Sequence, residues 1–516
     1  MITAGVSAQT PEEKKAAEWV GSLNLGDPAK EARLEGVVVQ HLRAVKMYND
    51  EHVPMPKTAH DSLMNGLRKD LPDSQVNKIL DKYTVGKVDF TLRGYKAIVP
   101  DLTPQEEAVI RKNLEQAREE AMDVKNMKQI SAVFEIYKTK NEQYLNSNGR
   151  NWHELFKAYV NEVKRKKVVL VEEFLYDTAG FPECHAATIA ETPGGLVAAY
   201  FGGTQERNPD VCIYVSRKAQ GAKVWTAPMN VANGIQGNGG KGNGAKGTVV
   251  RYACWNPVLY QIPAGELLLY YKIGPSPAKW KGWLIRSKDG GLSWSKPEAL
   301  PEGFLGPIKN QPVALANGTL ICPTSVEDGG WKIHFELTSD GGKTYQMGGA
   351  VPAAADLKAI QPTILLHKDG TMQALSRSQN RAILSTESKD GGRSWSPLEA
   401  TELPNNNSGI DGVTLADGRQ LLVYNHVLPP VGETKGERSP LNVAVSPDGK
   451  SWSAALVLED DHAGQYSYPS VIQSKDGMVH IVYTWHRKKI KYVEIDPSKL
   501  ELKKIENGVW PETVKK

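Results

Sequence analysis

The sequence of 516 residues has few cysteines and almost no excess of charge. The 63 lysines and arginines nearly balance the 59 aspartates and glutamates, and the net charge of +4 is spread along the chain rather than collected in one stretch. A nucleic-acid partner is therefore not expected. The four cysteines lack the close spacing of a zinc site, so we expect no metal, no cofactor and free, at least partly buried thiols. They are Cys184, Cys212, Cys254 and Cys322.

The sequence also lacks a long hydrophobic run. No stretch reaches the roughly 18 apolar residues that a membrane-spanning helix needs, so no membrane span is expected. Residues 1–10 read like the end of a secretory signal peptide, with small residues at cleavage-site spacing but no basic region or apolar core before them. We expect this segment to be a signal-peptide remnant or a disordered tail, and the protein to be periplasmic or secreted.

Residues 11–164 have helical spacing of apolar residues and almost no strand pattern. Thr103, Pro104 and Glu106 form a capping-box signature that predicts a helix from about 104 to 124. Further helices are predicted near 11–24, 29–49, 60–83 and 128–164. This all-α half resembles an uncharacterised helical domain of exported bacterial proteins, and we expect it to contact a protein partner, to self-associate or to support the second half.

The second half, residues 165–516, contains a motif that recurs four times. Each copy has a serine or threonine, then Asp-Gly, then an aromatic residue, and follows a short β-rich run. The glycines tolerate the positive φ of a tight hairpin, and the ring can fill the space between two sheets. A period of roughly 50 to 58 residues indicates propeller blades. The four copies are Ser287–Trp294, Thr338–Tyr345, Ser388–Trp395 and Ser446–Trp452.

Strand runs divide residues 165–516 into six blades, beginning near residues 184, 256, 311, 361, 411 and 468. The sixth blade is short of one strand. The run at residues 168–174 could supply that strand and close the ring, which would remove exposed sheet edges. The fold class predicted from the sequence is therefore an all-β six-bladed propeller preceded by an all-α domain.

The recurring motif resembles the Asp-box of sialidases, and the chain is similar to the predicted-neuraminidase group of the sialidase superfamily over about residues 167–496. Sialidases bind the substrate carboxylate with three arginines, use a tyrosine nucleophile that a glutamate activates, and supply an aspartate as acid and base. The resemblance implies that Tyr468, which opens blade six, is the nucleophile. Arg377 and Arg438 match the second and third arginines and would bind a carboxylate.

Two positions depart from the sialidase pattern. His185 stands where a sialidase has its first arginine, and Gln361 stands where it has the activating glutamate. Glutamine cannot accept a proton, so the usual relay from tyrosine to glutamate is absent. His185 could act as a cation when it is protonated, or as the base itself, because its ordinary pKa is about 6.5.

Other polar residues complete the predicted site. Asp210 falls in the loop where sialidases carry the acid/base aspartate, and Glu206 competes with it in the same loop. At the ends of other strands, Asn256, Asp411 and His426 are suited to sugar hydroxyls.

Three functions remain open from the sequence. The first is a sialidase-like glycoside hydrolase that releases a terminal sialic acid or related carboxylated sugar from an acidic glycan. The second is a lyase or hydrolase acting on uronates with His185 and Tyr468. The third is a propeller that binds carbohydrate without turnover.

Overall fold

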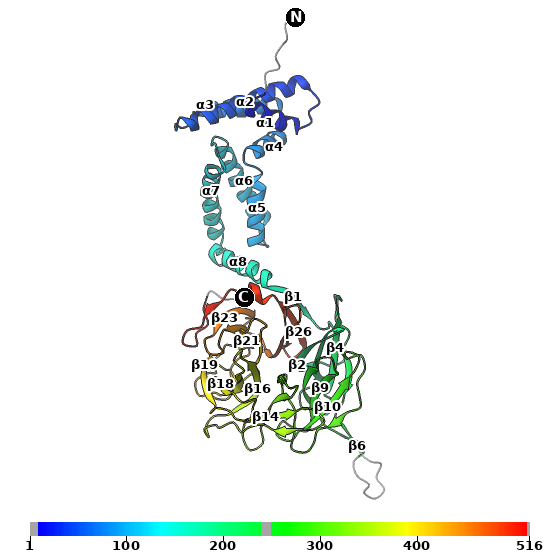
Figure 1. The fold of residues 1–516 in the computed structure, drawn as a ribbon. Helices are drawn as coiled ribbons and strands as arrows, with labels where there is room; N and C mark the ends of the chain where they lie inside the picture. The colour runs from blue at the N-terminus through cyan, green and yellow to red at the C-terminus, as the bar shows by residue number, and fades with distance from the viewer. Residues whose placement is uncertain (1–8, 239–248, 513–516) are drawn as a thin grey trace. The chain divides into compact units, whose positions relative to one another are not determined.

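The computed structural model describes residues 9–238 and 249–512. Most of the predicted signal-peptide remnant, residues 1–8, lies outside this range. The chain forms two compact units, Met1–Val160 and Asn161–Lys516, which we describe separately. Figure 1 shows a helical part followed by a ring of β-sheets. No helix in the described part of the chain is long and apolar enough to cross a membrane.

The first unit is helical, as predicted. Buried apolar side chains form one core among α1 to α4 and a second among α5 to α7, including Leu34 and Leu67 in the first and Leu114 and Phe134 in the second. The helices are α1 (Pro11–Gly21), α2 (Pro28–Asp50), α3 (Lys57–Asp70), α4 (Asp73–Tyr83), α5 (Lys87–Ile98), α6 (Pro104–Ala121), α7 (Met127–Ser147) and α8 (Trp152–Val168), which continues into the second unit.

The capping box at α6 is confirmed, since the side chains of Thr103 and Glu106 each accept a hydrogen bond from the other's backbone N–H. Two predicted helices were too long. The helix expected over 60–83 ends before Pro72, which has no N–H, and the helix expected over 128–164 is interrupted at Gly149, where φ is +84°. Helix α5 was missed because Gly94 and β-branched residues weaken its helical signal.

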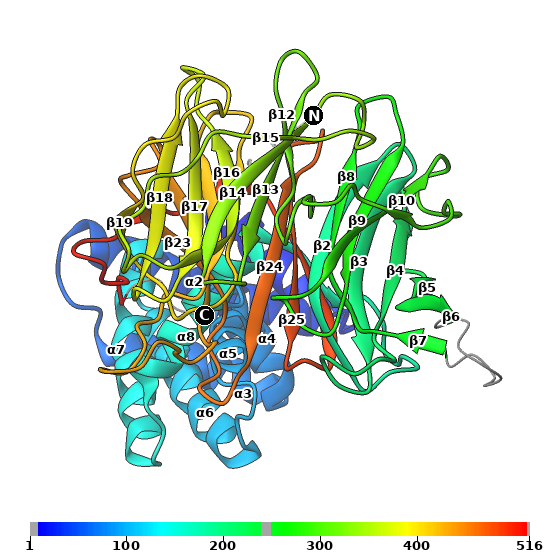
Figure 2. The same cartoon turned by 90° about the horizontal axis from the view of Figure 1, so that it is seen from below.

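The second unit is the predicted six-bladed propeller, whose blades are antiparallel sheets (Figure 2). Blades one to three comprise β2 (Glu183–Thr192), β3 (Gly195–Gly203), β4 (Cys212–Ala219), β5 (Met229–Ala232); β8 (Cys254–Gln261), β9 (Leu267–Ile273), β10 (Lys281–Ser287), β11 (Glu298–Ala299); and β12 (Val313–Ala314), β13 (Leu320–Val326), β14 (Lys332–Thr338), β15 (Gln346–Met347).

Blades four to six complete the ring among the described residues. They comprise β16 (Ala359–Leu366), β17 (Met372–Ser378), β18 (Ala382–Ser388), β19 (Glu399–Pro404); β20 (Asp411–Thr414), β21 (Gln420–Tyr424), β22 (Leu441–Ser446), β23 (Ser453–Glu459) with β27 (Lys503–Lys504); and β24 (Tyr466–Gln473), β25 (Val479–Trp485), β26 (Lys489–Ile495). A separate hairpin pairs β6 (Ile235–Asn238) with β7 (Val249–Arg251), and a short 3-10 helix spans Pro497–Lys499.

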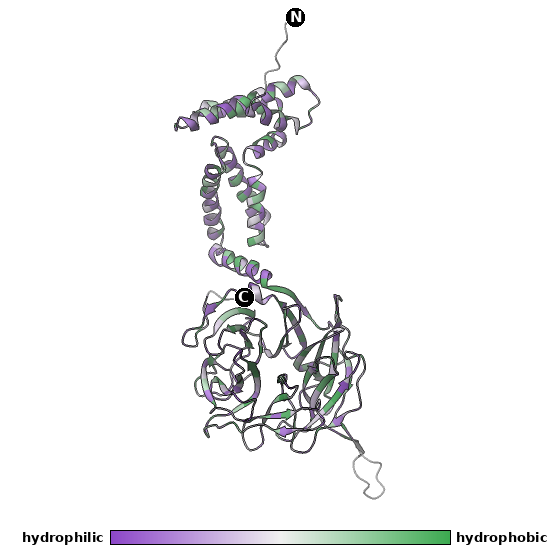
Figure 3. Ribbon diagram, in the orientation of Figure 1, coloured by the Kyte–Doolittle hydropathy of each residue, from purple (hydrophilic) through white to green (hydrophobic). Residues whose placement is uncertain are grey.

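The ring closes as predicted. Strand β1 (Val169–Phe174) pairs antiparallel with β26, so the first strand of the unit is the outer strand of the last blade. Apolar clusters then join neighbouring blades, for example Val197 and Ile213 of blade one with Leu259 and Leu269 of blade two. Figure 3 shows hydrophobic residues recurring along the strands. The four cysteines are free and buried, as expected.

The Asp-box copies are tight turns, as predicted. In the copy of blade three, Thr338 Oγ1 donates to Asp340 Oδ1 at 2.9 Å, and the Gly342 N–H donates to Thr338 Oγ1 at 2.9 Å. Hydrogen bonds from the same turn hold the pKa of Asp340 well below its usual value, although burial opposes them. The ring of Tyr345 is buried beside the turn.

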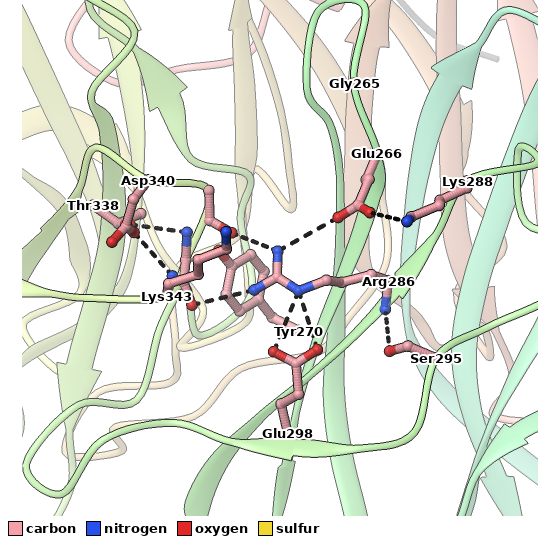
Figure 4. Close-up of polar contacts among 12 residues, drawn as sticks. Gly265, Glu266, Tyr270, Arg286, Lys288, Ser295, Glu298, Thr338, Asp340 and Lys343 are labelled. Atoms are coloured by element: carbon pink, nitrogen blue, oxygen red, sulfur yellow. Dashed lines mark hydrogen bonds and ion pairs between the residues drawn. The ribbon is translucent and has the colours of Figure 1, made fainter.

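An arginine of one blade binds the Asp-box of the next blade. Arg286 on β10 donates through Nη1 to the Gly341 carbonyl at 2.7 Å, while its Nε donates to Glu298 at 3.1 Å (Figure 4). Arg217 on β4 repeats the arrangement, because its Nε donates to the Gly290 carbonyl at 2.7 Å. These contacts fix neighbouring blades relative to each other, and so fix the strand ends that carry the site.

Candidate active site

The inner strands of four blades share one irregularity near their first residues. Ala186, Asn256, Gln361 and Tyr468 have φ values of +56°, +35°, +55° and +54°, and each strand has a register shift at this point. Positive φ is strained for these residue types, so the surrounding structure must hold it. The bulge of each strand places a polar or aromatic residue at the same level. On β8, β16 and β24 it is the positive-φ residue itself, and on β2 it is His185, next to Ala186.

Tyr468 lies at the centre of the polar cluster. Its phenol oxygen accepts hydrogen bonds from Arg377 Nη1 at 2.7 Å and from Gln361 Nε2 at 3.2 Å. Arg377 Nη1 also donates to Gln361 Oε1 at 3.3 Å, which fixes the orientation of the amide. Gln361 therefore presents an N–H to the tyrosine, at the place where a sialidase glutamate would accept the phenol proton.

Two predicted arginines lie beside Tyr468. The guanidinium carbons of Arg377 and Arg438 are each 5.8 Å from the centre of the tyrosine ring. Arg377 Nε donates to Asn407 Oδ1 at 2.9 Å, and Arg438 Nη1 donates to Ser467 Oγ at 3.2 Å. Burial lowers the pKa of Arg438 to about 10, so its guanidinium is still charged at neutral pH.

A third cation, Lys309, is buried beside the same ring. Its ammonium lies 5.9 Å from the Tyr468 ring centre and donates to the Ile410 carbonyl at 2.9 Å, to Asn310 Oδ1 at 2.7 Å and to the Pro469 carbonyl. Burial lowers the pKa of Lys309 to about 8. Because its partners come from blades three, five and six, this lysine ties the blades together around the tyrosine.

His185 packs directly on Tyr468, with ring centres 4.1 Å apart. Its Nδ1 shares a hydrogen bond with Thr484 Oγ1 at 2.9 Å. Burial, and then the nearby positive charges of Arg487 and Arg438, hold the pKa of His185 well below 6.5. His185 is therefore neutral at neutral pH and does not replace the missing arginine as a cation.

Arg487 brings a further positive charge to the place where the first arginine is missing. It lies in the turn between β25 and β26, and its carbonyl accepts a hydrogen bond from the Cys184 N–H at 2.8 Å, which holds the turn beside the start of β2. Its guanidinium forms an ion pair with Glu206. No motif in the sequence marks Arg487 as a site residue.

Asp210 is engaged within its own loop. Its Oδ2 accepts from the Thr204 N–H at 2.8 Å and its Oδ1 accepts from Thr204 Oγ1 at 2.9 Å. Both carboxylate oxygens thus close the loop between β3 and β4. These bonds hold the loop, and the acid/base role of Asp210 remains a prediction.

Asp411 lies in the core rather than in the cluster around Tyr468. Its Oδ1 accepts from Thr363 Oγ1 at 2.8 Å and its Oδ2 from the Val471 N–H at 2.9 Å, so it links blades four, five and six. Burial raises the pKa of Asp411. Substrate would have to displace these buried bonds to reach its oxygens.

Among the described residues, no hydrogen bond, ion pair or ring contact links His426 or Asn256 to Tyr468. His426 Nδ1 bonds to Tyr424 Oη at 2.6 Å and its Nε2 to the Gly508 carbonyl at 2.8 Å, and burial lowers its pKa to about 4. Both ring nitrogens are therefore occupied away from the cluster. Asn256 is buried in the bulge of β8.

Two residues of the β13–β14 hairpin join the site without having been predicted. The Trp331 ring lies 5.2 Å from the guanidinium carbon of Arg377, and Glu327 interacts with the charges of Arg377 and Arg207. Hairpin tips carry no motif, so the sequence offered no signal for either residue. Within residues 9–238 and 249–512, no group of three or more His, Cys, Asp or Glu side chains is arranged to hold a metal ion.

Comparisons with known families match both units. The BNR repeat-like domain family matches residues 194–481, and a protein of unknown function (DUF3826) family matches residues 49–165. No curated protein matches the chain significantly.

Solved structures resemble the propeller at low sequence identity. A protein of unknown function from Dyadobacter fermentans is 16% identical with a TM-score of 0.51, over 64% of this chain and 99% of that one. The NanB sialidase of Streptococcus pneumoniae is 13% identical with a TM-score of 0.50, over 64% of this chain and 71% of that one. The Hadza microbial sialidase Hz136 is 17% identical with a TM-score of 0.50, over 62% and 66%.

At these identities the solved structures establish the fold, whereas the family match covers more than half of the chain. With its Asp-box turns, its six closed blades and a tyrosine–arginine cluster at the strand ends, the chain belongs to the BNR repeat-like domain family, with a sialidase-type propeller preceded by a helical DUF3826 domain.

Proposed function

We propose that the propeller is a sialidase-like glycoside hydrolase that releases a terminal acidic sugar, a sialic acid or a related carboxylated sugar, from a complex glycan. The observation that carries the proposal is the tyrosine oxygen held by an arginine, with further arginines around it. Arg377 bonds to Tyr468 Oη at 2.7 Å, Arg438 lies beside the same ring, and Arg487 lies near His185. Two of the proteins with a similar fold are named sialidases.

The arginines give the site its preference for an anion. A sugar carboxylate can accept charge-assisted, two-pronged hydrogen bonds from guanidinium groups, and these bonds are roughly twice as strong as neutral ones. The same charge explains why a tyrosine suits the nucleophile position, because a carboxylate nucleophile would be repelled by the substrate's own charge.

In the proposed reaction, Tyr468 Oη attacks the anomeric carbon and the bond to the leaving oxygen breaks. The N–H groups of Arg377 and Gln361 stabilise negative charge on the phenol oxygen as its proton leaves. Neutral His185, in ring contact with the tyrosine, is the base that takes this proton. Water then releases the sugar from the tyrosine, and the phenol regains its proton.

The neutral state of His185 also favours a second candidate. A neutral imidazole beside a tyrosine and several arginines could remove a proton from a uronate whose carboxylate the arginines neutralise, with Tyr468 as the acid. Such a lyase would leave an unsaturated sugar that absorbs ultraviolet light. A hydrolase would not, so the product spectrum separates the two candidates.

The test is hydrolysis of a fluorogenic sialic-acid glycoside and of a panel of uronate glycans by the wild type and by Tyr468→Phe. Tyr466→Phe is the matched control, because Tyr466 lies two residues away on the same strand. We expect sialoside hydrolysis that Tyr468→Phe reduces at least ~10³-fold, as loss of a nucleophile does. Turnover of a uronate alone would favour the second candidate. Binding of an acidic glycan without turnover would indicate that the propeller only binds carbohydrate.

A further inference from the structure

Cleavage of a glycosidic bond needs a group that gives a proton to the leaving oxygen. The carboxyl groups predicted from the sequence are already engaged. Both oxygens of Asp210 accept hydrogen bonds from Thr204, and Glu206 is paired with Arg487. Gln361 carries an amide, which cannot serve as the acid.

Glu327 enters the site from an unexpected blade. Strand β13 of blade three runs against the site, because Ser325 Oγ near its end accepts a hydrogen bond from the Gln361 N–H at 3.1 Å. Glu327 follows two residues later, directly after the end of β13 at Val326. Its carboxyl group therefore belongs to the chain that leaves the strand beside Gln361.

The hairpin tip then folds back over the arginine of the site. Gly329 and Gly330, with φ of +69° and +108°, turn the chain so that the Trp331 ring lies 5.2 Å from the guanidinium carbon of Arg377. Trp331 thus packs against the arginine that bonds to Tyr468, and Glu327 lies near enough to interact with the charge of that arginine.

The surroundings of Glu327 suit a carboxyl that exchanges its proton. Partial burial raises its pKa, while Arg377, the Trp331 N–H and Arg207 lower it and Glu206 raises it. Burial dominates, so the net shift is upward. General acids among glycosidase carboxyls are raised in the same way.

We propose that Glu327 is the proton donor and acceptor at the leaving-group oxygen, a catalytic role at a position that the sequence pattern leaves to Asp210. This inference rests on the proposed hydrolase function. In the first step the carboxyl proton of Glu327 moves to the leaving oxygen, the bond from that oxygen to the anomeric carbon breaks, and Tyr468 Oη bonds to the carbon.

In the second step the carboxylate of Glu327 takes a proton from water. The water oxygen bonds to the anomeric carbon and the bond to Tyr468 Oη breaks. Glu327 is then protonated again, and the phenol recovers the proton that His185 held. No oxidant, metal or other reactant is needed.

The test compares two glycosides of the acidic sugar that the wild type hydrolyses. One has a nitrophenol leaving group, which needs little protonation, and the other has a sugar leaving group, which needs full protonation. We expect Glu327→Gln to lower kcat on the sugar leaving group by ~10²- to 10⁴-fold and to change the nitrophenyl rate far less. In Glu327→Gln the fall of the rate at basic pH should also disappear from the pH–rate profile.

The matched control is Asp328→Asn, which removes an equal charge from the next, exposed residue of the hairpin and should leave both rates unchanged. Glu327→Asp serves as the conservative variant and should recover part of the lost rate. If Glu327→Gln slows both substrates equally, or neither, while the wild type is active, the assignment of Glu327 is overturned and the hydrolase stands. A wild type that hydrolyses neither substrate overturns the proposed function itself.

Discussion

Replacing Arg377 by lysine keeps the positive charge but removes the planar set of donors. In the structure Nε of Arg377 donates to Asn407, and Nη1 donates to both Gln361 and Tyr468. Within the described residues Nη2 has no hydrogen-bond partner, so it is the atom that the site can offer to a substrate carboxylate. A single ammonium group cannot make all of these bonds.

The size of the effect follows from one lost substrate contact. A hydrogen bond to a charged group contributes about 1.5–3 kcal/mol, and about 1.4 kcal/mol corresponds to a factor of ten. We therefore expect Arg377→Lys to lower kcat/KM for an acidic glycoside by about 10- to 150-fold. The same substrate with its carboxylate converted to a methyl ester lacks the charge and should lose much less.

The assay is kcat/KM on the acid and the ester for the wild type, Arg377→Lys and the control Arg393→Lys. Arg393 is exposed in an Asp-box turn, so its substitution should leave both values unchanged. An equal loss on the acid and the ester would refute the reasoning. In that case Arg377 would act by positioning Tyr468 rather than by binding the carboxylate.

Three further predictions follow from single contacts. Gln361→Glu should raise kcat by ~10²-fold, because a carboxylate in place of the amide nitrogen that lies 3.2 Å from Tyr468 Oη can take the phenol proton; an unchanged rate would show that this proton leaves by another route. Gly409→Ala should lower kcat by about tenfold, because the new Cβ would lie 3.0 Å from Lys309 Cε and 3.3 Å from the Tyr468 ring and displace these side chains; an unaffected kcat would contradict this. The Ser394 side chain and then other hydrogen bonds lower the pKa of Asp390 to about 2. The contribution of Asp390 to folding stability is therefore present above about pH 4 and is lost as the pH falls toward 2. Urea unfolding midpoints of Asp390→Asn should accordingly fall less steeply over that range than those of the wild type.

The sequence predicts the propeller well because the Asp-box repeats mark each hairpin by a local rule. The turn chemistry of Thr338 and Asp340 depends only on residues within the motif, and the same holds for the capping box at Thr103. The ring closure by β1 was predictable because one blade lacked a strand. Helix α5 was not, since its apolar core contacts override the weak helical tendency of Gly94.

The site was predictable only where a motif and a strand end coincide. Tyr468 and Arg377 are such residues, and the structure brings them within hydrogen-bond distance. Arg487 and Glu327 lie in turns whose position depends on how distant blades meet, so nothing in the adjacent sequence marks them. The same dependence explains Asp411, whose place at a strand start suggested a sugar contact but whose oxygens are taken by two neighbouring blades.

The two departures from the sialidase pattern act on the charge of the site in opposite directions, and Arg487 offsets the second of them. Gln361 replaces an anion by a neutral donor, and the neutral His185 replaces a cation that Arg487 supplies from the neighbouring blade. The site therefore keeps its arginine charge and has lost one negative charge that would have opposed it. Attraction for an anionic sugar follows from this sum whichever of the three functions holds, since each needs the carboxylate to be bound first. What the lost glutamate changes is the route of the phenol proton, and that is why substitutions at Gln361 and Glu327, rather than at the arginines, distinguish catalysis from binding.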